Sequence, residues 1–85
     1  MKLDFEKSAY EDFQYWIKND KKKALKILQL LEDIEIQPFS GLGKPEPLKY
    51  NLSECWSRRI DLEHRLVYKI EGDVIKIYSC RFHYN

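Results

Sequence analysis

The sequence predicts an α+β fold in which an N-terminal strand and a helical hairpin pack on one face of a mainly antiparallel sheet. Apolar residues recur at helical spacing between residues 9 and 34, whereas polar and apolar residues alternate, as in strands, over much of residues 55–81. Glycine and proline gather between these two regions, where we expect a loop. The 85 residues leave room for one domain, residues 1–85, and the 44% hydrophobic content is enough for a compact core.

The first expected elements are a short strand and a helix. Residues 2–5 alternate polar and apolar side chains, as a strand does. Ser8 and Glu11 have the spacing of a capping box, in which each side chain bonds to the other residue's backbone N–H. They predict a helix that runs to about Lys18. Its expected apolar stripe comprises Ala9, Phe13, Trp16 and Ile17.

A second helix is expected to follow at once and complete the hairpin. Asp20 is the expected N-cap, and Pro38 ends the helical pattern. Lys21, Lys22 and Lys23 stand in the first turn, where positive charge is mildly unfavourable against the helix dipole. We interpret this run as a solvated helix end, with contact to a large polyanion as the alternative. The predicted buried face comprises Ala24, Ile27, Leu28, Leu31 and Ile34.

The loop after the helices holds a carboxylate between two prolines. Pro45 and Pro47 fix their own φ angles and push Lys44 and Glu46 towards an extended backbone. Glu46 is therefore held by rigid neighbours, either as an exposed loop acid or as a functional group. The nearby glycines do not form a dinucleotide or phosphate-loop motif, because the sequence lacks the strand and helix that would flank one.

The rest of the chain is predicted to form an antiparallel meander. We expect strands at residues 48–50, 55–60, 65–70 and 74–81, with a hairpin turn centred on Gly72 before the last of them. Because side chains point alternately to the two faces of a sheet, the apolar set of the two central strands can face the core.

The opposite face of the two central strands is expected to be basic. The same alternation puts Arg59, Arg65 and Lys69 on this outer surface. All four arginines lie in residues 44–85, which hold eight basic residues against six acidic ones. The planar guanidinium group suits bidentate contact with phosphate. This face is therefore the predicted phosphate-binding surface, with a set of solvated sheet edges as the plainer interpretation.

The two cysteines are interpreted as reduced thiols of the core. Cys55 and Cys80 lack the ligand count of a zinc site, and we expect neither a metal nor a cofactor. Charged residues follow Met1 almost at once, and no apolar run approaches the roughly 20 residues of a membrane span. These features predict a cytoplasmic protein.

Four residues can supply the groups that RNA cleavage needs, if the last strand lies beside the central pair. They are Glu46, Arg65, His83 and Tyr84. Attack of a ribose 2′-OH on the adjacent phosphorus needs a base, a cation for the non-bridging oxygens and an acid for the departing 5′-oxygen. Histidine suits the acid at neutral pH, whereas glutamate is a weak base there and serves either as base or to orient the 2′-OH.

Each of these signals also has a plainer explanation. His83 is explained equally by a solvated imidazole near the end of the chain, and Tyr84 by a ring packed on the sheet. His64 lies in a polar turn and is assigned no role. Only the combination of the four residues indicates a catalytic site.

Four blocks of sequence, in order, resemble the YoeB toxins of the RelE superfamily. They read Gly-Lys-Pro-Glu-Pro-Leu-Lys at 43–49, Trp-Ser-Arg-Arg-Ile at 56–60, Glu-His-Arg-Leu-Val-Tyr at 63–68 and Cys-Arg-Phe-His-Tyr at 80–84. The resemblance covers nearly the whole chain. It implies a RelE-like, microbial-RNase-like fold and a toxin of a bacterial type II toxin–antitoxin pair, which cuts messenger RNA in the ribosomal A site and stops translation.

The resemblance also implies roles and partners. Glu46 corresponds to the general base, His83 to the general acid, Arg65 to the transition-state clamp and Tyr84 to a residue that orients or stacks the substrate. The implied RNA-binding and phosphate-binding residues are Lys44, Lys49 and Arg59. The implied partners are a YefM-type antitoxin, a second toxin copy, and operator DNA through the toxin–antitoxin complex.

Two other functions are compatible with the same superfamily fold. One is a non-catalytic module that acts as a corepressor within a toxin–antitoxin–operator complex, and the other is a gyrase-poisoning toxin. Neither function uses Glu46, Arg65 and His83 together, so their joint presence favours the nuclease.

Overall fold

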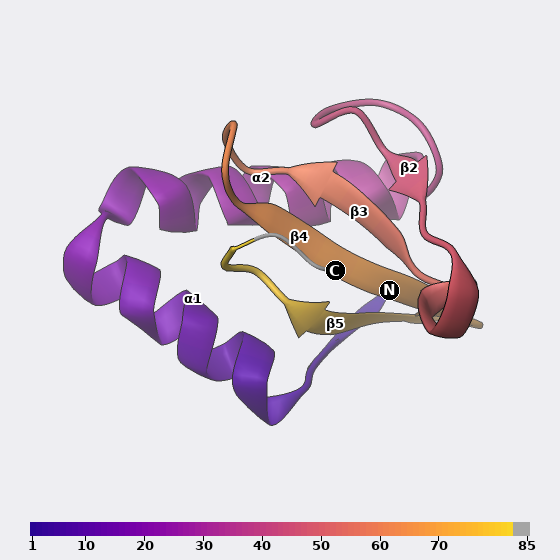
Figure 1. Cartoon of the computed structure of the whole chain (residues 1–85), viewed down its shortest axis with the longest axis horizontal. Helices are drawn as coiled ribbons and strands as arrows, with labels where there is room; N and C mark the ends of the chain where they lie inside the picture. Colours follow the sequence, from indigo (N-terminus) through magenta and orange to yellow (C-terminus); the bar gives the residue numbers. More distant parts are fainter. Residues whose placement is uncertain (83–85) are drawn as a thin grey trace.

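A computed structural model describes residues 1–82 and shows two helices packed on a five-stranded sheet (Figure 1). The strand order is β1-β5-β4-β3-β2, with β1 parallel to β5 and the other neighbours antiparallel. The elements are β1 (Lys2–Phe5), α1 (Lys7–Asn19), α2 (Lys21–Ile36), β2 (Glu46–Pro47), the short 3₁₀ helix η1 (Tyr50–Leu52), β3 (Trp56–Arg59), β4 (Arg65–Glu71) and β5 (Val74–Ser79). This architecture confirms the predicted α+β fold. No helix in the described part of the chain is long and apolar enough to cross a membrane.

The strand nearest the loop differs from its prediction. We expected it at residues 48–50, but β2 is Glu46–Pro47 and the chain then turns into η1. The turn follows from Tyr50, whose φ of 60° lies in the left-handed region and cannot continue a strand. Pro47 is tolerated because β2 is an edge strand, where a missing N–H does not interrupt the sheet.

The start of α1 also differs from its prediction. The helix begins at Lys7 with Glu6 as its N-cap, and no side chain caps it, so the predicted capping box is wrong. Sheet pairing decides the entry instead, because the Glu6 N–H donates to the Ile77 carbonyl at 2.9 Å. The Ser8 hydroxyl is drawn to the Tyr78 carbonyl, to which it donates at 3.2 Å.

The cap of α2 is likewise formed by the main chain. Asp20 occupies the predicted N-cap position, but its side chain makes no capping hydrogen bond. Its carbonyl accepts from the N–H groups of Lys23 and Ala24. Its carboxylate lies 3.8 Å from the Lys23 ammonium, so it offsets part of the charge of the lysine run.

The core lies between the helices and one sheet face, and two predicted core positions are wrong. Ile17 is 45% exposed on α1, and Leu28 is 42% exposed on α2, where Leu30 is buried instead. The buried stripe of α2 combines spacings of three and four, which brings Leu30 rather than Leu28 over the sheet. The fully or nearly buried members of the core include Ala9, Trp16, Ile27, Leu30, Leu31, Ile34, Leu66, Tyr68, Ile75 and Ile77.

A buried arginine joins the sheet to the loop that follows α2. Arg58 has no exposed surface, and its guanidinium pairs with the Asp33 carboxylate at 2.5 Å. Its remaining acceptors are the Tyr68 hydroxyl and the main-chain carbonyls of Gln37, Ser40 and Leu42. The Tyr68 hydroxyl in turn donates to the Pro38 carbonyl at 2.7 Å. A buried charge needs a full set of partners, and here the loop carbonyls provide most of them.

Replacing Arg58 with Met should lower the free energy of unfolding by about 3–5 kcal/mol, because it leaves the Asp33 carboxylate and several loop carbonyls without their donor. Urea denaturation followed by tryptophan fluorescence measures this loss. Arg59→Met is the matched control: the neighbouring side chain is exposed, and its loss should change the stability by about 0.5 kcal/mol or less. Equal effects of the two substitutions would contradict the role given to Arg58.

Acid should weaken the same network. The Asp33 carboxylate accepts hydrogen bonds from the Gln37 amide, the Leu42 N–H and the Arg58 guanidinium, which lower its pKa from 3.8 to about 2. Because the pKa is lower in the folded state, this carboxylate stabilises the fold above about pH 4, and the contribution is lost as the pH falls towards 2. The urea midpoint of the parent should fall across this window more steeply than that of Asp33→Asn, which cannot ionise. Parallel pH profiles for the two proteins would refute this account.

Candidate active site on the outer sheet face

The sheet register brings three predicted site residues to one face. Glu46 pairs with Ser57, which pairs with Val67, and Arg59 pairs with Arg65. Directly paired residues point to the same side of a sheet, as do residues two apart on one strand. Glu46, Arg59 and Arg65 therefore share the face turned away from the helices, which we call the outer face.

The same register sets the spacing between Glu46 and Arg65. Glu46 and Arg65 lie two strands apart, about 10 Å across the sheet, and are offset by two residues, about 7 Å along it. Their backbones are thus about 12 Å apart, and both side chains extend from the same face. This spacing leaves room for one phosphodiester group between a carboxylate and a guanidinium.

The Arg65 side chain is held by the turn that precedes β4. Its Nη1 donates to the carbonyls of Asp61 at 2.9 Å and His64 at 3.1 Å. Arg65 is half-buried, and Arg59 stands directly opposite it on β3. Like charges in directly opposite positions repel, so an anion bound between these two arginines would relieve the repulsion. Two guanidinium groups of this kind, one of them held by the turn, suit a phosphate whose charge grows during reaction.

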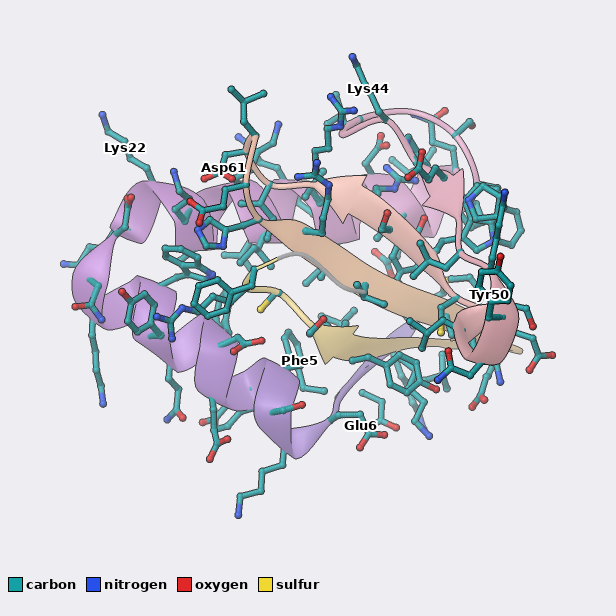
Figure 2. The ribbon with its side chains drawn as sticks, viewed as in Figure 1. Phe5, Glu6, Lys22, Lys44, Tyr50 and Asp61 are labelled. Carbon is teal, nitrogen blue, oxygen red and sulfur yellow. The ribbon has the colours of Figure 1, made fainter. Side chains whose placement is uncertain are left out.

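A glycine brings the loop close to the end of β3. The Arg59 N–H donates to the Gly43 carbonyl at 2.7 Å. Gly43 has a φ of 79°, and an added Cβ would lie 3.0 Å from both the Arg59 carbonyl and a Leu30 methyl group. Only glycine combines this backbone with so close an approach. Lys44 follows at the surface, where Figure 2 shows its side chain projecting from the loop.

A surface hollow of about 570 Å³ adjoins Glu46 and is lined by residues 46–52. Lys49 and Tyr50 both line it, and Tyr50 is 90% exposed on η1 (Figure 2). An exposed aromatic ring beside a basic residue is the arrangement that holds unpaired nucleotide bases. Within residues 1–82, no cluster of three or more histidine, cysteine, aspartate or glutamate side chains is placed to hold a metal ion.

The outer face is less charged than predicted. Lys69 pairs with Glu54 and Glu71, each at 3.1 Å, and these hydrogen bonds raise its pKa. It is therefore tied to two carboxylates and does not present a free charge to phosphate. The middle of the face is apolar, with Leu48, Cys55 and Val67 buried in a small cluster that includes Leu52 and Tyr78.

Both cysteines are buried and unpaired, as predicted for core thiols. Burial raises the pKa of the Cys55 thiol. It raises the pKa of Cys80 to about 12. Neither residue forms a thiolate readily, so neither is suited to act as a nucleophile.

Two predicted catalytic residues, His83 and Tyr84, lie outside the described residues. The described chain ends at Phe82, whose carbonyl accepts a hydrogen bond from the Arg65 N–H at 3.1 Å. The described chain therefore ends beside the start of β4, where Arg65 stands. The roles of Glu46, Arg65, His83 and Tyr84 remain predictions.

Sequence reasoning missed a second set of contacts around the turn between β3 and β4. Asp61 lies in this turn (Figure 2), and its carboxylate contacts the Lys23 ammonium at 3.0 Å. One residue of the lysine run is thus bound within the fold. His64 is only 8% exposed, and its Nδ1 accepts the Phe82 N–H at 2.7 Å. Nothing in the local sequence distinguishes this buried imidazole from an ordinary turn residue.

Comparison with known proteins finds relatives that match nearly the whole chain. A family model described as "YoeB-like toxin of bacterial type II toxin-antitoxin system" matches residues 5–84. Toxin YoeB of Escherichia coli K12 is 50% identical over 84 residues, which are 99% of this chain and 100% of that protein.

Two solved structures from Staphylococcus aureus are similar in both sequence and fold. The YoeB dimer is 47% identical with a TM-score of 0.94, and a heterotetrameric YoeB–YefM complex is 47% identical with a TM-score of 0.92. Each match covers 99% of this chain and 98% of the solved chain. The chain therefore belongs to the family of YoeB-like toxins of bacterial type II toxin–antitoxin systems.

Proposed function

We propose that this toxin is a ribosome-dependent endoribonuclease that cleaves messenger RNA in the A site and so inhibits translation. The observation that carries the proposal is the placement of Glu46 and Arg65 on one sheet face, with their backbones about 12 Å apart, beside a hollow with an exposed tyrosine. A gyrase poison or a corepressor would need no such pairing of a carboxylate and a guanidinium.

The proposed reaction is an internal transfer within the RNA. Glu46 accepts the proton of the ribose 2′-OH, or orients that group, as its oxygen attacks the adjacent phosphorus. The P–O2′ bond forms while the P–O5′ bond breaks, and His83 donates a proton to the departing 5′-oxygen. Arg65 neutralises the charge on the non-bridging oxygens, a task for which no metal is required. Tyr84 orients or stacks the substrate.

The low net charge explains why such an enzyme would depend on the ribosome. The chain carries a formal charge of only +1, and affinity for free RNA follows the number of phosphates that a protein neutralises. Lys44, Lys49 and Arg59 are proposed to contact the RNA backbone around the cut. The ribosome would supply the remaining positioning, which is worth several kcal/mol when it aligns reacting groups.

The proposed protein partners of this chain are those seen in the solved structures of its relatives. The S. aureus proteins include a YoeB dimer and a YoeB–YefM complex. We infer that this chain likewise forms a homodimer and is neutralised by a YefM-type antitoxin, whose tail folds over the site. Operator DNA would be bound only through the toxin–antitoxin complex. Action on ribosomes would place the protein in the cytoplasm.

Single substitutions of Glu46, Arg65 or His83 should slow cleavage strongly while the protein stays folded. We expect Glu46→Gln, Arg65→Ala and His83→Ala each to lower the single-turnover rate on programmed ribosomes by about 10²–10⁴-fold. Each substitution removes either a proton transfer or the cation that neutralises charge in the transition state. Glu71→Gln is the matched control, because it alters another exposed carboxylate of the same sheet that lies outside the site. A Glu46→Gln rate equal to that of the parent would remove the base assignment, and an unchanged His83→Ala rate would remove the acid assignment.

The chemistry of the cut ends tests the nucleophile. Attack by the 2′-OH should leave a 2′,3′-cyclic phosphate, or the 3′-phosphate formed by its hydrolysis, on the upstream fragment and a 5′-hydroxyl on the downstream fragment. End-group analysis of the messenger fragments by mass spectrometry distinguishes these products. A 5′-phosphate on the downstream fragment would instead indicate water as the nucleophile and would overturn the mechanism. Intact messenger together with inhibited gyrase would favour the gyrase-poison alternative.

A further inference from the structure

The buried imidazole of His64 is a titratable group that the proposed reaction does not use. Its ring meets Trp16 edge to face, with centroids 4.7 Å apart, and lies 5.5 Å from the Phe82 ring. Its Nδ1 accepts the Phe82 N–H at 2.7 Å, so this nitrogen carries no proton. His64 therefore acts as a hydrogen-bond acceptor between the β3–β4 turn and the end of the described chain.

We propose that His64 is a positioning residue, which fixes Phe82 against the start of β4 and so sets the direction in which the chain continues to His83. The inference rests on the proposed function, because it matters for catalysis only if His83 acts there. Phe82 has a φ of 63°, in the left-handed region that a bulky residue rarely adopts. Such a conformation persists only where neighbouring groups hold it.

Both main-chain polar groups of Phe82 are held by adjacent residues of one strand start. The His64 Nδ1 takes the N–H at 2.7 Å, and the Arg65 N–H donates to the carbonyl at 3.1 Å. These two contacts hold the main chain of Phe82 through both its N–H and its carbonyl. Arg65 is also the proposed phosphate clamp, so a single turn locates both the clamp and the segment that carries the proposed acid.

The turn itself is rigid enough for this task. The Asp61 carboxylate accepts the N–H groups of Glu63 at 2.8 Å and His64 at 2.6 Å. Lys23 of α2 contacts the same carboxylate at 3.0 Å. These bonds fix the His64 backbone, and Trp16 packs against the imidazole ring. The Nδ1 atom is therefore held pointing towards the Phe82 N–H.

Separate contacts from α1 hold the two residues before Phe82. The Cys80 carbonyl accepts from Trp16 Nε1 at 2.8 Å, and the Cys80 N–H donates to the Asp12 carboxylate at 3.0 Å. The Arg81 guanidinium lies 3.4 Å from the centre of the Tyr15 ring. Loss of the His64 acceptor should therefore release Phe82 while the preceding residues keep their places.

Two substitutions separate the acceptor from the ring. His64→Phe keeps an aromatic ring against Trp16 but has no acceptor, whereas His64→Gln offers an amide oxygen in its place. We expect hydrogen exchange of the Phe82 amide, measured by NMR, to be at least about 10-fold faster in His64→Phe than in the parent. At saturating ribosome concentration the cleavage rate should fall by about 100-fold, as a small misplacement of a reacting group can cause. The ribosome concentration at half-maximal rate should stay the same, and His64→Gln should recover both the protection and the rate.

Ser8→Ala is the matched control, because it also removes a side-chain hydrogen bond to a carbonyl of the C-terminal region, at Tyr78, without touching Phe82. It should leave both measurements unchanged. The proposal is overturned if His64→Phe protects the Phe82 amide as the parent does, or cleaves at the parental rate. If circular dichroism shows His64→Phe to be unfolded, a folded His64→Gln that restores neither measurement overturns it equally. The exchange measurement needs no ribosome, so it decides the contact even if the parent protein does not cleave RNA.

Discussion

The guanidinium of Arg58, buried beneath β3, gathers the Asp33 carboxylate and three main-chain carbonyls of the segment that follows α2. Apolar side chains in place of both Arg58 and Asp33 could fill this space with little loss of stability. They could not, however, bring carbonyls of three different residues to one point. The charge therefore selects one path for the loop, and that path delivers Gly43 to the end of β3 and Glu46 to its outer face.

Two adjacent arginines thus have opposite tasks. Arg58 points into the core and shapes the loop, whereas Arg59 points outward beside Arg65. Because side chains alternate along a strand, a register shift of one residue would exchange them, burying one without partners and exposing the other. The apolar core and the charged outer face consequently depend on the same pairing of β3 with β4.

Local signals account for most of what the sequence predicted. The helices, the last three strands and the sharing of one face by Arg59 and Arg65 follow from periodicity, which each segment carries by itself. The errors arose where distant residues decide. Asp33 lies 25 positions before Arg58 in the chain, and His64 lies 18 positions before Phe82, so neither contact leaves a periodic trace. The capping box failed for the same reason, since pairing between the Glu6 N–H and β5 determined where α1 begins.

The strand order has a consequence for how the protein is made. β5 is the last strand along the chain, yet it lies between β1 and β4 in the sheet. During synthesis the N-terminal strand therefore has no neighbour until residues 74–79 have left the ribosome that is making them. Domains fold as units once their segments are available. A nascent chain of this toxin should thus lack its complete sheet until β5 has emerged and can pair with both β1 and β4.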